Sequence, residues 1–336
     1  MKRSTLYLLY PANKALERAI ADGLCVLNEQ DAAAAMPDTQ VAVADNFRYT
    51  RGNYEQQRYS ARVFERLREA LEASLAASPS AETQNNLGNI LAALGQQRRD
   101  AALFEQAVRC FNSALEAYSQ EDSPQAWATA QYNLGTANQA LGRLLETTSP
   151  LKLAVDAYTN ALLVWTREAH PEEWMQTMHQ LGATFYTYGI QLKGNRQLQK
   201  SVVAYKNALA VLNADDHALE LTATHNNRGV TLHHLGEAEE NPARLKEAIN
   251  SYELALTVSM EQQLPIHVSV LCRVNKATAQ NMLAQMSNDT ALAEAVADEF
   301  EVIIECFAHA LQPLCLRHCQ EQMKLARTAS SSQVAG

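Results

Sequence analysis

One phrase recurs along the chain at a nearly constant interval. Residues 83–95 read TQNNLGNILAALG, and residues 130–142 read AQYNLGTANQALG, 47 residues later. The place of the first glycine in this phrase recurs at steps of 47, 47, 47 and 48 residues, at Gly88, Gly135, Gly182, Gly229 and Ala277. A period between 20 and 50 residues is typical of stacked structural repeats. The sequence therefore predicts an array of about five similar units.

Each unit contains two segments with helical periodicity. In the first unit, the phrase places Leu87, Leu91 and Leu94 on one helical face, and the segment FEQAVRCFNSALEAY repeats its apolar residues at the same spacing. A small residue recurs in the second segment, followed four residues later by an aromatic residue at Phe111, Tyr158, Tyr205 and Tyr252. Two closely packed antiparallel helices need small side chains where their axes approach. We therefore predict an all-α fold, a right-handed α-solenoid of about five helical hairpins with helical caps at both ends.

This pattern resembles the tetratricopeptide repeat. The resemblance is carried by the Asn-Leu-Gly phrase, a glycine seven residues later, and the small, aromatic and small residues at Ala107, Phe111 and Ala114, with a proline between units. The usual tetratricopeptide unit has 34 residues, so the resemblance implies an extended variant with a 47-residue repeat. It covers about residues 80–310.

The flanking regions differ from the repeats and predict three parts of the chain. Residues 1–80 are expected to form an N-terminal helical cap region, with helices over 13–29 and 54–75. Residues 81–310 are expected to form the repeat array. Residues 311–336 are expected to form a capping helix, about 313–327, and a disordered tail with the composition of TASSSQVAG.

Composition narrows the class of protein. The net charge of −9 argues against a nucleic-acid partner, whose phosphates need cationic side chains. The six cysteines show no small-domain disulfide framework, and no apolar run is long enough to span a membrane. The five apolar residues 6–10 are too few for an export signal. We therefore predict a soluble, cytoplasmic protein without a cofactor, and the oligomeric state stays open.

The resemblance implies that the first helix of each hairpin lines a concave groove that binds peptides. Side chains expected there lie near the glycine places, and Gln139 is placed on the same face. The predicted partner-binding residues are Asn85, Asn86, Asn89, Tyr132, Asn133, Thr136, His179, Gln180, Tyr186, Asn226, Asn227, His233, His234 and Asn275. An asparagine amide both donates and accepts, so a row of them can bind the backbone of an extended peptide. Alternatively, these residues cap neighbouring hairpins or face water.

The charge of the groove residues distinguishes this chain from one subclass of the tetratricopeptide family. Family members that bind the acidic carboxyl terminus of heat-shock chaperones carry Lys and Arg around two asparagines. The corresponding places here hold Asn85, Gln176 and Gln180, none of them basic. We therefore expect a neutral groove that reads its ligand through hydrogen bonds and aromatic contacts.

Two other clusters suggest different chemistry. The segment CFAHALQPLCLRHC could supply zinc ligands from Cys306, His309, Cys315, His318 and Cys319. Its spacing fits no familiar zinc pattern, and buried cysteines in a capping helix are the more ordinary interpretation. Arg58, Arg62 and Arg66 could form a basic stripe that binds nucleic acid or an acidic protein surface, but neighbouring glutamates favour a solvated helix face.

No phosphate-binding loop, nucleophile elbow or metalloprotease histidine pair appears. The sequence thus gives little support for catalysis, and the resemblance to the tetratricopeptide family implies a non-enzymatic protein–protein interaction adaptor or assembly scaffold. The alternatives are a peptide-sensing regulator or receptor of the tetratricopeptide type, and a metal-binding or redox protein that uses the Cys306–Cys319 cluster.

Overall fold

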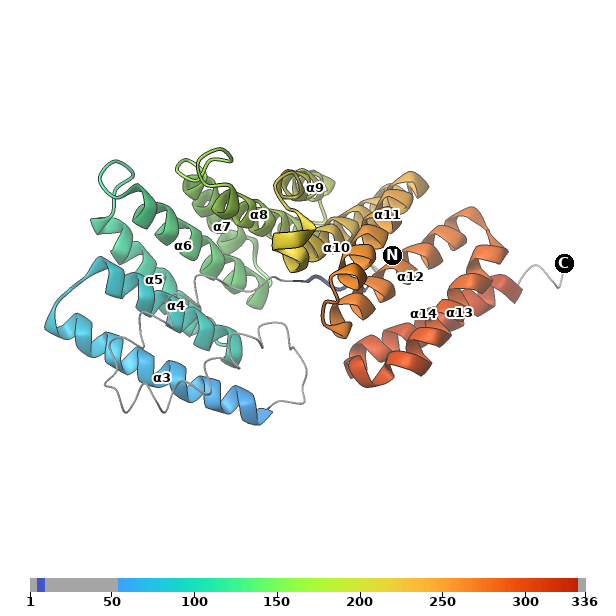
Figure 1. The fold of residues 1–336 in the computed structure, drawn as a ribbon, viewed down its shortest axis with the longest axis horizontal. Coiled ribbons are helices and arrows are strands. Elements are labelled where there is room, and N and C mark those ends of the chain that lie inside the picture. The colour runs from blue at the N-terminus through green and yellow to red at the C-terminus, as the bar shows by residue number, and fades with distance from the viewer. Residues whose placement is uncertain (1–4, 10–53, 332–336) are drawn as a thin grey trace. The chain divides into compact units, whose positions relative to one another are not determined.

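The computed structural model describes residues 5–9 and 54–331, and every regular element in these ranges is helical (Figure 1). The predicted helix over 13–29 lies outside the described residues. The elements are α3 (Tyr54–Ala77), α4 (Ala81–Arg98), α5 (Ala101–Ala117), α6 (Pro124–Leu144), α7 (Thr148–Ala161), α8 (Pro171–Leu192), α9 (Asn195–Leu209), α10 (Ala214–Glu239), α11 (Pro242–Glu261), α12 (Ile266–Ser287), α13 (Thr290–Phe307), the 3-10 turn η2 (Ala308–Ala310) and α14 (Pro313–Ser331).

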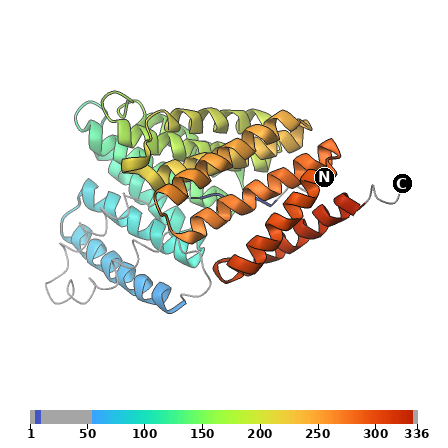
Figure 2. The same ribbon diagram turned by 45° about the vertical axis from the view of Figure 1, so that its right-hand side comes forward.

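The chain divides into two compact units. The N-terminal unit, Pro11–Lys193, contains α3 to α8, and the C-terminal unit contains Met1–Tyr10 together with Gly194–Gly336. In the first unit α4 packs against α5 and α6 against α7; in the second α10 packs against α11 and α12 against α13 (Figures 1 and 2). Each unit is thus a stack of helical hairpins. This is the predicted fold class, an all-α helical-repeat solenoid.

The repeat is visible in the backbone at the end of each first helix. A non-glycine residue there adopts a left-handed conformation, with φ between 47° and 53°, at Arg99, Glu146, Lys193, Glu240 and Asn288. Each lies four residues after the second recurring small residue of its first helix, which is Gly95, Gly142, Gly189, Gly236 or Ala284. The Arg99 N–H donates to the Gly95 carbonyl, and the Glu240 N–H donates to the Gly236 carbonyl. These hydrogen bonds close the C-terminal ends of the two helices. The start of the first helix is also regular, because Pro124 and Pro171 lie in the first turn of α6 and α8, where a missing N–H costs no hydrogen bond.

The recurring glycine and the recurring aromatic residue are partners. A Cβ atom on Gly88 would lie 2.6 Å from the Phe111 ring, and one on Gly229 would lie 2.7 Å from the Tyr252 ring. Both rings are fully buried. The first helix therefore needs glycine at this place because the aromatic side chain of the second helix fills the space that a Cβ would occupy.

The first and last described helices each bury one face on the neighbouring hairpin. Phe64, Leu67 and Leu71 of α3 pack with Ile90 and Leu94 of α4. At the other end, α14 packs against α13 and buries Cys315, Cys319 and Ala326. The helix α14 continues to Ser331, so residues 328–331, expected in the disordered tail, are helical.

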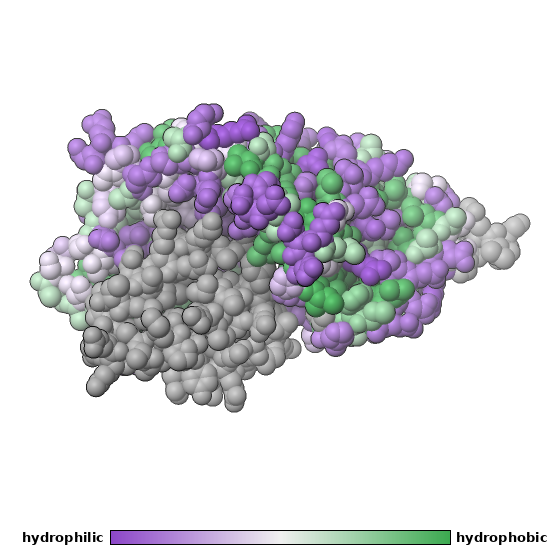
Figure 3. Space-filling view, in the orientation of Figure 1, coloured by the Kyte–Doolittle hydropathy of each residue, from purple (hydrophilic) through white to green (hydrophobic). Residues whose placement is uncertain are grey.

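The described surface is largely polar. Figure 3 shows hydrophilic residues over much of the visible described face, with smaller hydrophobic areas between them. The large apolar side chains that are exposed come from several different helices, as Leu153 of α7, Met260 of α11 and Leu314 of α14 do. Within the described ranges, no helix is long and apolar enough to cross a membrane.

Candidate functional site

An extended piece of the chain's own N-terminus lies on the C-terminal unit. Residues 5–9 have no regular secondary structure and lie beside α10 and α12 (blue in Figure 1). The Tyr7 N–H donates to Oδ1 of Asn275 at 3.0 Å, and Nδ2 of Asn275 donates to the Tyr7 carbonyl at 2.8 Å. One amide side chain therefore pairs with both backbone groups of one residue.

Asn227 binds Leu9 in the same way. The Leu9 N–H donates to Oδ1 of Asn227 at 2.8 Å, and Nδ2 of Asn227 donates to the Leu9 carbonyl at 2.6 Å. Nδ2 of Asn226 adds a second bond to the Tyr7 carbonyl, at 2.9 Å. Asn226, Asn227 and Asn275, here called the segment triad, are all buried.

The spacing of these bonds follows from extended geometry. In an extended chain the N–H and C=O groups of alternate residues point to the same side, so residues 7 and 9 present their backbones to the helices together. Because the triad forms hydrogen bonds only with backbone atoms of the segment, its binding of the segment does not depend on the identity of the segment's side chains. The amides thus bind an extended backbone that belongs to the same chain, and the binding of a partner peptide stays a prediction.

The Tyr7 ring enters a seat made by α14. Its hydroxyl is hydrogen bonded to Cys315, and its ring meets His318 edge-on at a centroid distance of 6.0 Å. Burial raises the pKa of Tyr7 well above its usual value, with Cys315 adding to the shift, so the phenol stays neutral. His318 has a lowered pKa because it is buried, and its Nε2 lies 3.0 Å from Oγ1 of Thr278.

This seat accounts for much of the Cys/His cluster. Cys315, His318 and Cys319 are buried, whereas Cys306 and His309 are exposed. Among the described residues, no group of three or more His, Cys, Asp or Glu side chains is placed to hold a metal ion.

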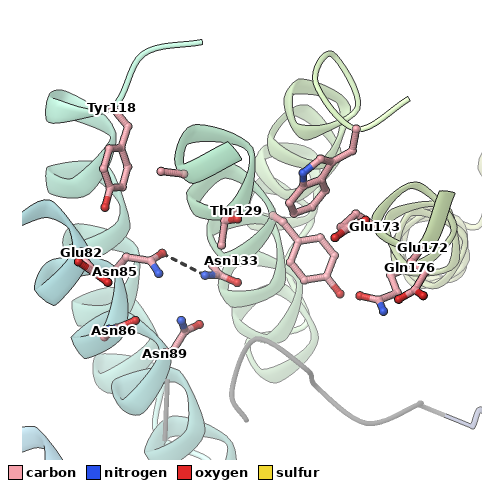
Figure 4. A pocket seen from close by; sticks show the side chains of 13 residues that line it. Glu82, Asn85, Asn86, Asn89, Tyr118, Thr129, Asn133, Glu172, Glu173 and Gln176 are labelled. Atoms are coloured by element: carbon pink, nitrogen blue, oxygen red, sulfur yellow. Dashed lines mark hydrogen bonds between the residues drawn. The ribbon is translucent and has the colours of Figure 1, made fainter. Parts of the chain in front are cut away.

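The N-terminal unit carries a pocket with a similar set of amides. It has a volume of about 370 Å³ and is formed mainly by α4, α6 and α8. Nδ2 of Asn133 donates to Oδ1 of Asn85 at 3.0 Å across the pocket (Figure 4). We call Asn85, Asn86 and Asn133 the pocket triad. The lining residues are Glu82, Asn85, Asn86, Asn89, Tyr118, Ala126, Thr129, Tyr132, Asn133, Trp165, Glu172, Glu173 and Gln176.

The charge of this pocket differs from the neutral groove that the sequence led us to expect. Glu82 lines it from α4, and Glu172 and Glu173 line it from α8, while no Lys or Arg of the described residues does (Figure 4). The expectation was wrong because it considered only the positions of the carboxylate clamp. The first turns of the helices, one turn earlier, supply the acidic groups.

Other predicted groove residues lie inside the hairpins. His179, His233 and His234 are buried, and burial lowers the pKa of His179 to about 4 and that of His233 well below its usual value. Thr136 bonds the Tyr158 hydroxyl of its own hairpin. The placement of Gln139 on the groove face was wrong: it is buried and donates to the backbone carbonyl of Gln180 at 3.3 Å.

The remaining predicted residues lie at the edges of these sites. Gln180 is half-buried and its side chain is hydrogen bonded to Tyr132, whose pKa burial raises to about 12. Tyr186 lines a different depression together with Arg143 and Gln191. Of the basic stripe, the Arg58 and Arg62 side chains lie outside what the structure describes.

Sequence reasoning missed several residues of the two sites. Glu82 lies four residues before Asn86 on the same helix, so helical periodicity alone could have placed it in the pocket. Trp165 and Tyr118 follow the ends of α7 and α5, and no spacing within one repeat connects them to the asparagines. Residues 5–9 carried no signal beyond a short apolar run.

Comparisons with known proteins agree with this architecture. No protein-family model and no curated protein matches this sequence. Among solved structures, the chain is similar to BtubC (BKLC) from P. vanneervenii, with 16% identity over 76% of this chain and 94% of that chain and a TM-score of 0.52. It also matches MamA, with 16% identity over 64% of this chain and 99% of that chain and a TM-score of 0.39. A third match is the TPR2AB-domain:pHSP90 complex of yeast Sti1, with 17% identity, 81% and 94% coverage and a TM-score of 0.32. The similarity to BtubC, with the hairpins described above, shows a TPR-like helical-repeat fold.

Proposed function

We propose that this protein is a non-enzymatic adaptor that binds extended segments of partner proteins through asparagine amides on its first helices. The proposal rests on one observation, the binding of residues 7 and 9 by the segment triad through backbone hydrogen bonds alone. A surface that holds one extended chain in this way has the chemistry to hold others. The 47-residue unit is then an extended form of the tetratricopeptide hairpin.

The pocket triad is the proposed partner site. Its amides line a pocket in the N-terminal unit, with aromatic side chains beside them, so an incoming segment meets both hydrogen-bonding groups and apolar surface. Hydrogen bonds to the backbone supply affinity, and the surrounding side chains supply specificity.

A library of random extended peptides, displayed on phage and panned against the full chain, tests this function. Sequences enriched on the wild-type protein should be lost on a variant with Asn86→Ala and Asn133→Ala. They should persist on a matched variant with the exposed residues Asn112→Ala and Asn250→Ala. Enrichment that is identical on all three proteins would contradict the proposal.

A second candidate function is a peptide-sensing regulator. It is favoured by the occupation of the segment triad by the chain's own residues, since a partner segment that binds there must first displace them. A peptide of matching pattern that raises hydrogen exchange at Leu9 would support regulation, and an unchanged exchange rate would favour the adaptor alone.

A further inference from the structure

The two asparagine triads occupy the same places in the repeat. Two members of each triad lie three and two residues before the first-helix glycine of one repeat. The third lies two residues before the corresponding place in the next repeat. The bond inside each triad is also the same: Asn133 donates to Asn85 at 3.0 Å, and Asn275 donates to Asn226 at 2.9 Å. The way residues 7 and 9 are bound is therefore a template for a chain in the pocket.

The template sets the direction and spacing of a bound segment. Asn275 binds Tyr7 and Asn227 binds Leu9, so the chain runs from the later repeat toward the earlier one. In the pocket, Asn133 takes the place of Asn275 and Asn86 takes that of Asn227. We call the residue bound by Asn133 the first anchor and the residue two places later, bound by Asn86, the second anchor.

The side-chain seat for the second anchor differs between the two sites. Leu9 belongs to a buried apolar cluster with Ala223, which lies four residues before Asn227. The place four residues before Asn86 holds Glu82 instead, and Glu82 lines the pocket.

The opposite wall of that seat changes as well. Val268 and the half-buried Leu271 of α12 contribute to the cluster around Leu9. Counted from the glycine place, the corresponding residues of α6 are Ala126 and Thr129, both of which line the pocket. The seat in the pocket is thus wider and carries a carboxylate.

The seat for the first anchor in the pocket also carries a carboxylate, at the place where the seat that receives Tyr7 has a thiol. Cys315 and His318, which receive Tyr7, lie two and five residues after the proline that begins α14. The residues two and five places after the proline that begins α8 are Glu173 and Gln176, and both line the pocket (Figure 4).

We infer that the pocket binds a cationic extended segment with arginine side chains at both anchors, two residues apart. Glu173 faces the first anchor and Glu82 the second, and each carboxylate accepts the paired N–H groups of a guanidinium. Tyr132 and Trp165 also line the pocket, with ring centroids 5.7 Å apart. Trp165 is buried, so the half-buried Tyr132 is the ring on which a planar guanidinium can stack, better than an ammonium. The inference rests on the proposed adaptor function and names the partner chemistry of the same site.

The test uses three fluorescein-labelled peptides and the full chain, with binding measured by fluorescence anisotropy. The peptides are Ser-Thr-Leu-Arg-Leu-Arg-Tyr-Pro, its counterpart with Glu at both arginine places, and the chain's own Ser-Thr-Leu-Tyr-Leu-Leu-Tyr-Pro. We expect the arginine peptide to bind about tenfold more tightly than the other two, since two partly exposed ion pairs distinguish them.

Two variants assign that preference to the pocket. Glu82→Gln with Glu173→Gln should reduce the preference for arginine to about twofold or less. A matched variant, Glu105→Gln with Glu116→Gln, removes the same charge from exposed positions of α5 and should keep the preference. Asn133→Leu, which keeps the branched shape of the side chain but cannot hydrogen bond, should weaken all binding several-fold; circular dichroism checks that each variant is folded.

The outcomes separate this inference from the proposed function. Equal binding of the arginine and glutamate peptides, with both weakened by Asn133→Leu, would overturn the inference and keep the adaptor function. A preference for arginine that survives the Glu82 and Glu173 changes would also overturn it. If no peptide bound in a way that Asn133→Leu weakens, both the inference and the proposed adaptor function would be overturned.

Discussion

Gly135 of α6 and Tyr158 of α7 share one space: a Cβ atom on Gly135 would lie 2.8 Å from Cδ1 of the Tyr158 ring. The ring is fully buried, and its hydroxyl is hydrogen bonded to Thr136 and Gln139 of the same first helix. Hydrogen bonds to the facing helix thus hold the ring against the glycine. A larger side chain at Gly135 would therefore push the Tyr158 ring or the two helices apart.

Gly135→Leu should therefore destabilise the N-terminal unit by about 1–3 kcal/mol, because the ring or the helix must move to make room. Urea denaturation followed by circular dichroism measures the change in the free energy of unfolding. Thr159→Leu, at the exposed position next to Tyr158, is the matched control and should cost less than ~0.5 kcal/mol. Equal losses in the two variants would mean that the close approach does not limit the packing.

Asn227→Ala should release the N-terminal segment. The substitution removes both partners of the Leu9 backbone, and each buried group left unpaired costs about 1–3 kcal/mol, so the segment is expected to leave rather than stay. Hydrogen exchange should then become faster at the Tyr7 and Leu9 amides. The exposed Asn250→Ala on α11 should leave both rates unchanged.

Asn133→Ala and Asn227→Ala should affect different properties of the protein. The first should weaken binding of an added peptide several-fold, since one net hydrogen bond contributes ~0.5–1.5 kcal/mol. The second should change the exchange of residues 7 and 9 but leave the binding of that peptide at the pocket unchanged. The double variant should show both the weaker peptide binding of Asn133→Ala and the changed exchange rates of Asn227→Ala. A loss of peptide affinity in Asn227→Ala alone would mean that the added peptide also depends on the segment triad.

Acidic pH should destabilise the protein through its buried histidines. Burial lowers the pKa of His179 to about 4 in the folded protein, against an unfolded value near 6.5. Between these values the unfolded chain binds a proton that the folded chain does not, so the free energy of unfolding falls as pH falls, by up to about 1.4 kcal/mol per pH unit.

Urea denaturation at pH 7, 6 and 5 measures this slope. Replacing His179 by Gln should make the slope shallower, and replacing the exposed His309 by Gln should not. Because His225 and His233 also have pKa values lowered by burial, part of the slope should persist in the His179 variant. A slope unchanged by His179→Gln would show that this residue is not the source.

The repeat and its helices could be read from the chain because their causes are local. Glycine, the aromatic residue and proline recur at fixed intervals, and each has a steric reason that acts within one hairpin. The asparagines of the first helices could be chosen as candidates for the same reason, since a fixed place in the repeat puts them on one side of their helices. Their capacity to bind an extended backbone follows from the amide group itself.

What occupies those amides was decided only by the tertiary structure. The contacts of Tyr7 with Asn275 and of Leu9 with Asn227 join residues more than two hundred positions apart, and no periodicity connects residues 5–9 with the repeats. From the sequence, Cys315 and His318 could be metal ligands or core residues of a capping helix. The structure shows that they contact the Tyr7 side chain. The acidic pocket likewise combines Glu82 with Glu173 from a helix two repeats later, and the burial of His179 and Gln139 depends on how neighbouring helices pack. Packing between repeats sets which side chains remain accessible, and that information is not contained in the pattern of any one repeat.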